Sequence, residues 1–236
     1  HGTDPRYGLF FAPLEAGRVP GPGDVVRLLE PERAAYSLIE AVDGRFLLLT
    51  DQDAPRGTVI SVDPQGDEGA WEVLLPEHAS DVIEDVALVG DRLLVTWMRD
   101  AANRLTIHDV GGRQLREVAL PGVGSVGGIS GHPGDPEAFV TYTSFLVPPT
   151  ILRMDVATGA LETFRAPELR FDPSRYETRQ VFVTSKDGTR VPVFLTHAKG
   201  LEPSGDVPVL LYGYGGFNIS LTPYFSLARL IFLEAG

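Results

Sequence analysis

A repeat of about 46 residues governs the first two-thirds of this 236-residue chain. It is clearest in three short alternating segments, each ending in an aspartate and each 46 residues from the next: Val59–Asp63, Leu105–Asp109 and Ile151–Asp155. A glycine-containing turn follows each aspartate, and another alternating segment then runs to a proline. One such unit cannot bury both of its faces alone, so copies must stack on one another.

Each copy of the repeat contains four segments with the period-two alternation of β-strands. The segments that end at the prolines Pro76, Pro121 and Pro167 are Trp71–Leu75, Leu115–Leu120 and Leu161–Phe164. Earlier in each copy lie Asp43–Thr50, Gly90–Trp97 and Asp135–Tyr142, preceded by Ala35–Ile39, Val82–Leu88 and Ser125–Ser130. Four short strands in about 45 residues are typical of one blade of a β-propeller. We therefore predict a mostly β chain with three complete blades and the end of another, formed by Gly8–Leu14 and Val25–Glu30 and closed by Pro31.

Composition agrees with a β-rich globular chain. Glycine and proline, with 26 and 19 residues, approach a fifth of the sequence without a low-complexity tract, which indicates many tight turns. The net charge of −12 argues against nucleic acid as a partner, because phosphate binding needs clustered Lys and Arg. The chain has no cysteine, which excludes disulfides, thiolate metal sites and a cysteine nucleophile. No apolar run approaches the roughly 18 residues of a membrane span, so no membrane partner is expected.

The periodicity ends after Pro167, and residues 168–175 have the composition of a connection between domains. Two alternating segments, Thr178–Thr184 and Thr189–Ala198, then flank an Asp-Gly pair within Ser185–Gly188, which predicts a hairpin. Pro192 places the second of these strands towards a sheet edge.

The last third of this region predicts a buried strand followed by a helix. Val207–Leu211 has the apolar character of a short buried strand. Ser220–Gly236 predicts one helix, with Thr222 as N-cap, Pro223 at the first helical position and Gly236 as the stop. A hairpin, a strand and a covering helix predict the opening of an α/β domain. We therefore divide the chain into residues 1–168 and 169–236.

The most distinctive local stretch is Leu210–Phe217. Three glycines lie between three aromatic residues in this stretch: Gly213, Gly215 and Gly216 among Tyr212, Tyr214 and Phe217. A glycine-rich turn after a strand is where α/β enzymes commonly place ligand contacts, and tyrosine hydroxyls are neutral donors at pH 7. The alternative is an aromatic turn that only packs two domains together, and the residues alone favour neither.

Other candidate sites have simpler structural explanations. Gly124–Gly127 lacks the first glycine of a G-x-S-x-G nucleophile elbow and lies inside a blade, so Ser125 is expected to be structural. Gly122–Gly127 matches a dinucleotide-binding pattern by letter, but no helix follows it. The five histidines lack metal-ligand spacing and are His1, His78, His108, His132 and His197. We therefore expect neither a metal nor a cofactor.

Several runs resemble the prolyl oligopeptidase family. The C-terminal ones are Ser185–Pro192, Leu211–Ser220 and Ser226–Phe232, and the part Tyr212–Ser220 is specific to this family. Upstream, the runs that resemble the propeller of the same family are Gly2–Pro5, Pro76–His78, Gly124–Gly127 and Tyr142–Leu146. The resemblance therefore runs along essentially the whole chain.

The resemblance implies a serine peptidase that cleaves short peptides after proline. In this family a seven-bladed propeller caps an α/β-hydrolase domain and limits access to short peptides. By motif, Tyr214 would be the oxyanion-hole tyrosine and Phe217 would line the proline-binding pocket. Gly213, Gly215 and Gly216 would let the backbone turn tightly enough to aim both side chains. The resemblance also implies a cytoplasmic location, with the periplasm as the alternative.

The resemblance further predicts a fragment. In the family order the Ser, Asp and His of the triad lie beyond Gly236, and earlier blades lie before His1. We therefore expect the rest of the same polypeptide as a partner, and no activity from this chain alone. Two alternatives stay open: an oligopeptidase B-like peptidase that cuts after basic residues, and a non-catalytic propeller that binds proteins. The second alternative predicts no G-x-S-x-G downstream of Gly236.

Overall fold

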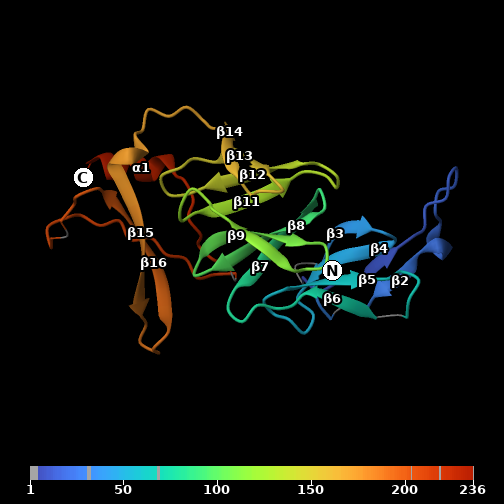
Figure 1. Cartoon of the computed structure of the whole chain (residues 1–236). Coiled ribbons are helices and arrows are strands. Elements are labelled where there is room, and N and C mark those ends of the chain that lie inside the picture. Colours follow the sequence, from blue (N-terminus) through green and yellow to red (C-terminus); the bar gives the residue numbers. More distant parts are fainter. Residues whose placement is uncertain (1–4, 31–32, 68–69, 203, 218, 236) are drawn as a thin grey trace.

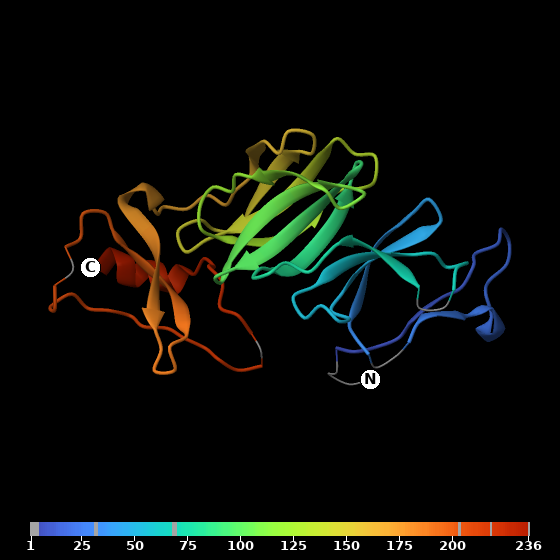
Figure 2. The ribbon, with the colours of Figure 1, turned by 60° about the horizontal axis from the view of Figure 1, so that its bottom comes forward.

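The computed structural model describes residues 5–30, 33–67, 70–202, 204–217 and 219–235. Within these residues the chain forms three four-stranded antiparallel sheets, two two-stranded sheets and one α-helix (Figure 1). The sheets follow one another in chain order and form an open row rather than a closed ring (Figure 2). The C-terminal hairpin and helix lie at the end of the row opposite the first strand pair (Figure 1).

The three complete blades are confirmed, and in each the strands pair in sequential order. The first blade contains β3 (Tyr36–Val42), β4 (Arg45–Thr50), β5 (Thr58–Val62) and β6 (Trp71–Leu75). The second contains β7 (Val82–Val89), β8 (Arg92–Arg99), β9 (Ala102–Asp109) and β10 (Gln114–Val118). The third contains β11 (Ser125–Ser130), β12 (Glu137–Thr143), β13 (Thr150–Asp155) and β14 (Leu161–Arg165). Several strand starts differ from the prediction by one or two residues, and the largest difference is at β9, which begins at Ala102 rather than Leu105. Asp100 and Ala101, with φ of 50° and 62°, form a tight turn after β8, so the next strand begins early.

The partial blade is also present as a strand pair. β1 (Leu9–Phe11) pairs antiparallel with β2 (Val26–Leu29), and a short 3₁₀ turn, η1 (Pro22–Asp24), lies between them. Leu29 is buried with Tyr36 and Leu48 of the first blade, so the pair covers the outer face of that blade. The predicted closing residue Pro31 lies outside the described residues.

The core lies between the blades, and strand alternation places it there. Successive side chains of a strand point to opposite faces of its sheet. In β8, Leu93 and Val95 cluster with Val59 of the first blade, whereas Leu94 clusters with Val140 of the third. All five side chains are fully buried. The second blade is therefore covered on both faces, as the repeat requires.

The predicted hairpin is confirmed. β15 (Tyr176–Thr184) pairs along its full length with β16 (Arg190–Ala198), and the 3₁₀ turn η2 (Pro173–Arg175) leads into it. Pro192 lies opposite Phe182 in this two-stranded sheet, where a missing N–H breaks no second ladder. In the part of the chain that the structure describes, no helix is long and apolar enough to cross a membrane.

The predicted strand Val207–Leu211 is wrong. This segment forms no strand and has no strand pairing, and Val209 and Leu211 are 83% and 86% exposed. A buried strand needs neighbours for its backbone groups, and Pro208 supplies no N–H. No described strand lies beside the segment, so an apolar run stays unpaired.

The helix is shorter than predicted. α1 spans Leu227–Ala235, so Thr222 is not its N-cap and Pro223 is not its first residue. The carbonyl of Pro223 accepts a hydrogen bond from Ser125 Oγ at 2.7 Å, and the amide of Phe225 donates to Thr143 Oγ1 at 3.4 Å. These groups contact the third blade instead of joining a helix. The predicted stop, Gly236, lies outside the described residues.

Candidate functional site

The structure places the predicted site residues on a short exposed turn before α1. Tyr214 is 48% exposed and Phe217 is 91% exposed. Phe217 has a φ of 54°, the left-handed region that non-glycine residues seldom adopt. Both side chains are therefore available for contact, and the backbone at Phe217 is held in an unusual conformation.

Only one of the three glycines has a close neighbour at the place where a Cβ would lie. A Cβ added at Gly216 would lie 2.8 Å from the Tyr214 hydroxyl oxygen, which is closer than real Cβ atoms come. A Cβ at Gly213 or Gly215 would meet nothing within 4 Å. Gly216 thus allows the Tyr214 ring to lie against the backbone of the turn.

A cluster of aromatic rings around Arg229 joins this turn to the third blade. The Arg229 guanidinium lies 4.2 Å from the Tyr224 ring centroid, 5.2 Å from that of Tyr212 and 5.7 Å from that of Phe145. Phe145 follows β12, Tyr212 belongs to the turn, and Tyr224 precedes α1. Sequence reasoning missed Arg229, because its ring partners lie up to 84 residues away along the chain.

Ser125 is structural, as predicted from its position inside a blade. Its side chain is buried and its hydroxyl donates to the Pro223 carbonyl, 98 residues away in sequence. The serine therefore holds the C-terminal segment against β11. Nothing in the sequence pattern indicates this partner.

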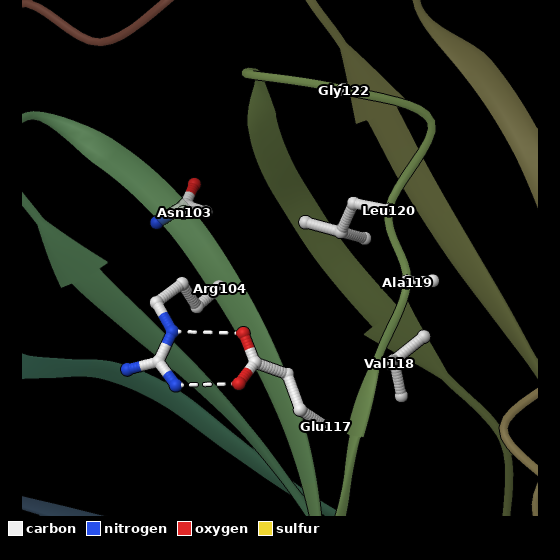
Figure 3. Close-up of a pocket in the computed structure, with 7 residues that line it drawn as sticks. All are labelled: Asn103, Arg104, Glu117, Val118, Ala119, Leu120 and Gly122. Carbon is white, nitrogen blue, oxygen red and sulfur yellow. Dashed lines mark hydrogen bonds and ion pairs between the residues drawn. The ribbon is translucent and has the colours of Figure 1, made fainter.

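A pocket of about 420 Å³ lies at the second blade, and no residue of the turn lines it (Figure 3). Its charged side chains, Arg104 and Glu117, form a two-bond pair of 2.9 and 2.7 Å. Hydrogen bonds from Arg104 hold the pKa of Glu117 below its usual value. Asn103 is also engaged, donating to Glu84 at 2.5 Å and accepting from the amide of Val126 at 2.8 Å. The polar side chains of this pocket thus already form hydrogen bonds with other groups of the protein.

Arg104 of that pocket also contacts a buried carboxylate, that of Asp81, whose side chain is 1% exposed. It accepts hydrogen bonds of 2.8 Å each from Arg99, Arg104 and Ser80. Burial alone would raise the pKa of Asp81, but the Arg99 and Ser80 hydrogen bonds and nearby positive charge outweigh it and lower that pKa. Perturbed carboxylates mark candidate sites. Here Arg99 and Arg104 both donate to the Asp81 carboxylate. The cluster therefore stabilises the second blade.

His108 belongs to a buried polar chain rather than to a catalytic pair. Trp97 Nε1 donates to Thr106 Oγ1 at 2.7 Å, Thr106 lies 2.8 Å from His108 Nε2, and His108 Nδ1 lies 2.9 Å from the Gly112 carbonyl. Burial lowers the pKa of His108. The neutral tautomer with hydrogen on Nδ1 satisfies all of these groups. The other strand histidine, His197, lies 3.8 Å from Glu177 on the hairpin.

Comparison with known proteins gives a consistent result. Residues 2–167 match the family described as prolyl oligopeptidase, N-terminal beta-propeller domain. A prolyl endopeptidase from Elizabethkingia meningoseptica is 35% identical over 196 residues, covering 82% of this chain and 28% of that protein. A prolyl endopeptidase from Dictyostelium discoideum is 29% identical over 212 residues, covering 84% of this chain and 28% of that protein.

Solved structures agree over the whole chain. A chain from a study of two prolyl endopeptidases and their inter-domain dynamics is 35% identical with a TM-score of 0.84, covering 100% of this chain and 34% of that one. Prolyl oligopeptidase B from Galerina marginata is 27% identical with a TM-score of 0.85, covering 99% and 33%. The chain thus spans about a third or less of the length of these relatives.

Proposed function

The chain belongs to the prolyl oligopeptidase family, and from that premise we propose that it is a segment of a serine endopeptidase that hydrolyses short peptides on the C-terminal side of proline. The observation that carries the proposal is the family match over residues 2–167, joined to 35% identity with a prolyl endopeptidase over 82% of the chain. The match covers the three blades. Within this proposal, residues 1–168 belong to the propeller and 169–236 open the α/β-hydrolase domain.

The proposed role of Tyr214 is to stabilise the oxyanion. When a serine oxygen attacks the carbonyl carbon of a proline residue, the carbonyl oxygen gains negative charge. A neutral tyrosine hydroxyl fixed near that oxygen donates a hydrogen bond that strengthens as the charge develops. Support comes from the family motif, from the partial exposure of Tyr214, and from Gly216, which lets the tyrosine ring lie close to the backbone.

The proposed role of Phe217 is to form part of the wall against which the pyrrolidine ring packs. An aromatic face offers apolar area to a ring that has no N–H. Phe217 is 91% exposed, so its apolar surface is open for a substrate or for another part of the enzyme to cover. The family motif supports this assignment.

The nucleophile must come from outside these residues, because the sequence contains no G-x-S-x-G run. In the proposal, the Ser, Asp and His of the triad are supplied by the rest of the same polypeptide. The 236-residue chain alone is therefore expected to leave a chromogenic Gly-Pro substrate unchanged. Turnover that survives purification to homogeneity would contradict this expectation.

We also propose that the blades limit access to the site by peptide length. Prolyl oligopeptidase B from Galerina marginata was solved with a 35mer hydrolysis and macrocyclization substrate. Peptides of that length therefore test the limit. A cytoplasmic location remains part of the proposal, and fractionation of the source cells against a periplasmic marker enzyme tests it.

A chimaera tests the proposed specificity. The segment of the Elizabethkingia meningoseptica prolyl endopeptidase that this chain matches is replaced by the chain, and the product is assayed with reporters that carry proline, lysine or arginine before the scissile bond. We expect cleavage after proline. Preferred cleavage after lysine or arginine would support the oligopeptidase B-like alternative and contradict the proposal.

The non-catalytic alternative has a separate test in the coding sequence. A G-x-S-x-G run encoded downstream of Gly236 supports the peptidase. A continuous reading frame without such a run favours a propeller that only binds proteins.

A further inference from the structure

Few polar contacts hold the C-terminal segment against the blades. Ser125 Oγ donates to the Pro223 carbonyl, Thr143 Oγ1 accepts from the Phe225 amide, and Gln180 Nε2 donates to the Asp100 carbonyl at 2.5 Å. None of these contacts involves the turn Tyr212–Phe217 itself. Among the described residues, the contact that joins the turn to the third blade is therefore of another kind.

Arg229 supplies that contact through aromatic rings rather than a counter-ion. Its guanidinium lies within 6 Å of three ring centroids, those of Tyr224, Tyr212 and Phe145. It also donates to the Tyr224 hydroxyl at 2.6 Å and to the Tyr224 carbonyl at 3.4 Å. Among the described residues, no carboxylate pairs with Arg229. A planar guanidinium suits this position, because it can stack on one ring while its N–H groups reach a hydroxyl.

The three rings come from the two regions that must be held together. Phe145 follows β12 of the third blade and also contacts Phe194 of the hairpin, with ring centroids 5.4 Å apart. Tyr212 is two residues before Tyr214. Fixing the Tyr212 ring therefore limits the movement of the turn that carries Tyr214 and Phe217.

We propose that Arg229 is a positioning residue, which holds the Tyr212–Phe217 turn against Phe145 of the third blade. Its consequence for catalysis rests on the proposed function, because it acts through the placement of Tyr214. Its structural effect does not depend on catalysis. The two parts can therefore be measured separately.

Limited proteolysis with chymotrypsin measures the structural part in the 236-residue chain. The turn itself offers Tyr212, Tyr214 and Phe217 as cleavage sites, and cleavage there requires local opening. In Arg229→Ala we expect cleavage within the turn to be roughly three- to tenfold faster, the effect of losing a partly buried cation–π contact. Arg229→Lys should restore part of the protection, since it keeps the charge but loses the planar group.

A second variant tests the same contact from the blade side. Phe145→Leu leaves the turn and α1 unchanged in sequence, yet it should accelerate cleavage in the turn because Arg229 loses one of its rings. The matched control is Arg190→Ala, which removes a cation–π contact of 4.2 Å with Phe182 on the hairpin. Cleavage of the turn at the control rate in both Arg229→Ala and Phe145→Leu would overturn the proposal.

The catalytic part is measured in the chimaera. Arg229→Ala should lower kcat for a proline reporter while KM changes little, and Arg229→Lys should recover part of kcat. An unchanged kcat alongside a loosened turn would show that the turn needs no positioning for catalysis and would contradict this part. If the unmodified chimaera cleaves nothing after proline, the proposed function fails, and the proteolysis result still decides the structural role of Arg229.

Discussion

The blades and the C-terminal region are stabilised in different ways. In the second blade, Leu93, Leu94 and Val95 are fully buried by neighbours on both faces. In the C-terminal region, Val209, Leu211 and Phe217 are 83%, 86% and 91% exposed, and the Arg229 guanidinium lies near three aromatic rings, one of them that of Tyr212 in the turn. The apolar side chains of the second blade are thus used for packing between blades, whereas those of the C-terminal region stay exposed and available for other contacts. Substitutions in the blades should change global stability, and those in the C-terminal region should change local order and activity.

The two tryptophans allow the regions to be measured separately. Trp71 and Trp97 lie in the first and second blades, and residues 168–236 contain no tryptophan. Tryptophan fluorescence during denaturation therefore reports the blades, and chymotrypsin cleavage at the turn reports the C-terminal region.

The largest effect on the blades is expected for Gly112→Ala. Gly112 lies in the turn between β9 and β10 with a φ of 88°, and an added Cβ would overlap the Leu74 carbonyl of the first blade. We expect a loss of about 3–5 kcal/mol in the free energy of unfolding, from backbone strain and from separation of the two blades. Urea denaturation followed by tryptophan fluorescence measures it.

The control for this prediction is Gly134→Ala. Gly134 has a φ of 90° but nothing within 4 Å of an added Cβ. Only backbone strain is therefore expected, with a loss of about 1 kcal/mol in the free energy of unfolding. Equal losses in the two variants would show that contact between the blades at Gly112 contributes little.

Asp81→Asn should have the next largest effect. The substitution replaces a buried carboxylate by a neutral amide, which weakens the charged hydrogen bonds from Arg99 and Arg104, while both arginines keep access to solvent. We expect a loss of about 2 kcal/mol from these charged hydrogen bonds, measured by the same denaturation. Asp109→Asn removes a solvent-exposed pair with Arg113 and should cost clearly less. An Asp81→Asn chain as stable as its parent would contradict the structural role given to this cluster.

A smaller effect is expected from pH through His108. Its pKa is lowered in the folded state, so unfolding takes up a proton when the pH is below the ordinary value near 6.5. The stability it contributes is therefore complete above that value and falls as the pH falls. Between pH 7 and 5 we therefore expect the free energy of unfolding to decrease, as measured by urea denaturation at each pH. His108→Gln should flatten that part of the pH profile, and an unaltered slope would remove His108 as its cause.

The smallest effect on the blades is expected for Ser125→Ala. Ser125 lies in the third blade and contacts the C-terminal segment. The variant loses one hydrogen bond to the Pro223 carbonyl, and tryptophan-monitored stability should change by about 1 kcal/mol or less. Chymotrypsin cleavage after Tyr224 and Phe225 should nevertheless become faster. A large loss of blade stability without faster cleavage would mean that Ser125 supports the blade rather than the C-terminal segment.

The blades could be predicted from the sequence because their information is local and repeated. Strand alternation and turn residues recur every 46 residues or so, and each copy confirms the others. The start of β9 was missed, since an alanine such as Ala101 gives no indication of positive φ. The Asp81 cluster was missed for a different reason. Its members, Ser80, Asp81, Arg99 and Arg104, meet only when the sheet forms.

The C-terminal region was predicted less well because its conformation depends on distant contacts. An apolar run such as Val207–Leu211 has the same pattern whether or not a neighbouring strand exists to pair with it. The start of α1 was wrong because Ser125 and Thr143 engage the backbone before it. Tyr214 and Phe217 were assigned from the family motif, and their roles remain predictions.

The central claim is that this chain carries the oxyanion donor of a prolyl peptidase, and Tyr214→Phe in the chimaera tests it most directly. The control is Tyr212→Phe, because the Tyr212 ring, and not its hydroxyl, contacts Arg229. We expect Tyr214→Phe to lower kcat roughly a hundredfold with a smaller change in KM, and Tyr212→Phe to leave kcat near the parent value. A kcat that is unchanged in Tyr214→Phe would contradict the claim.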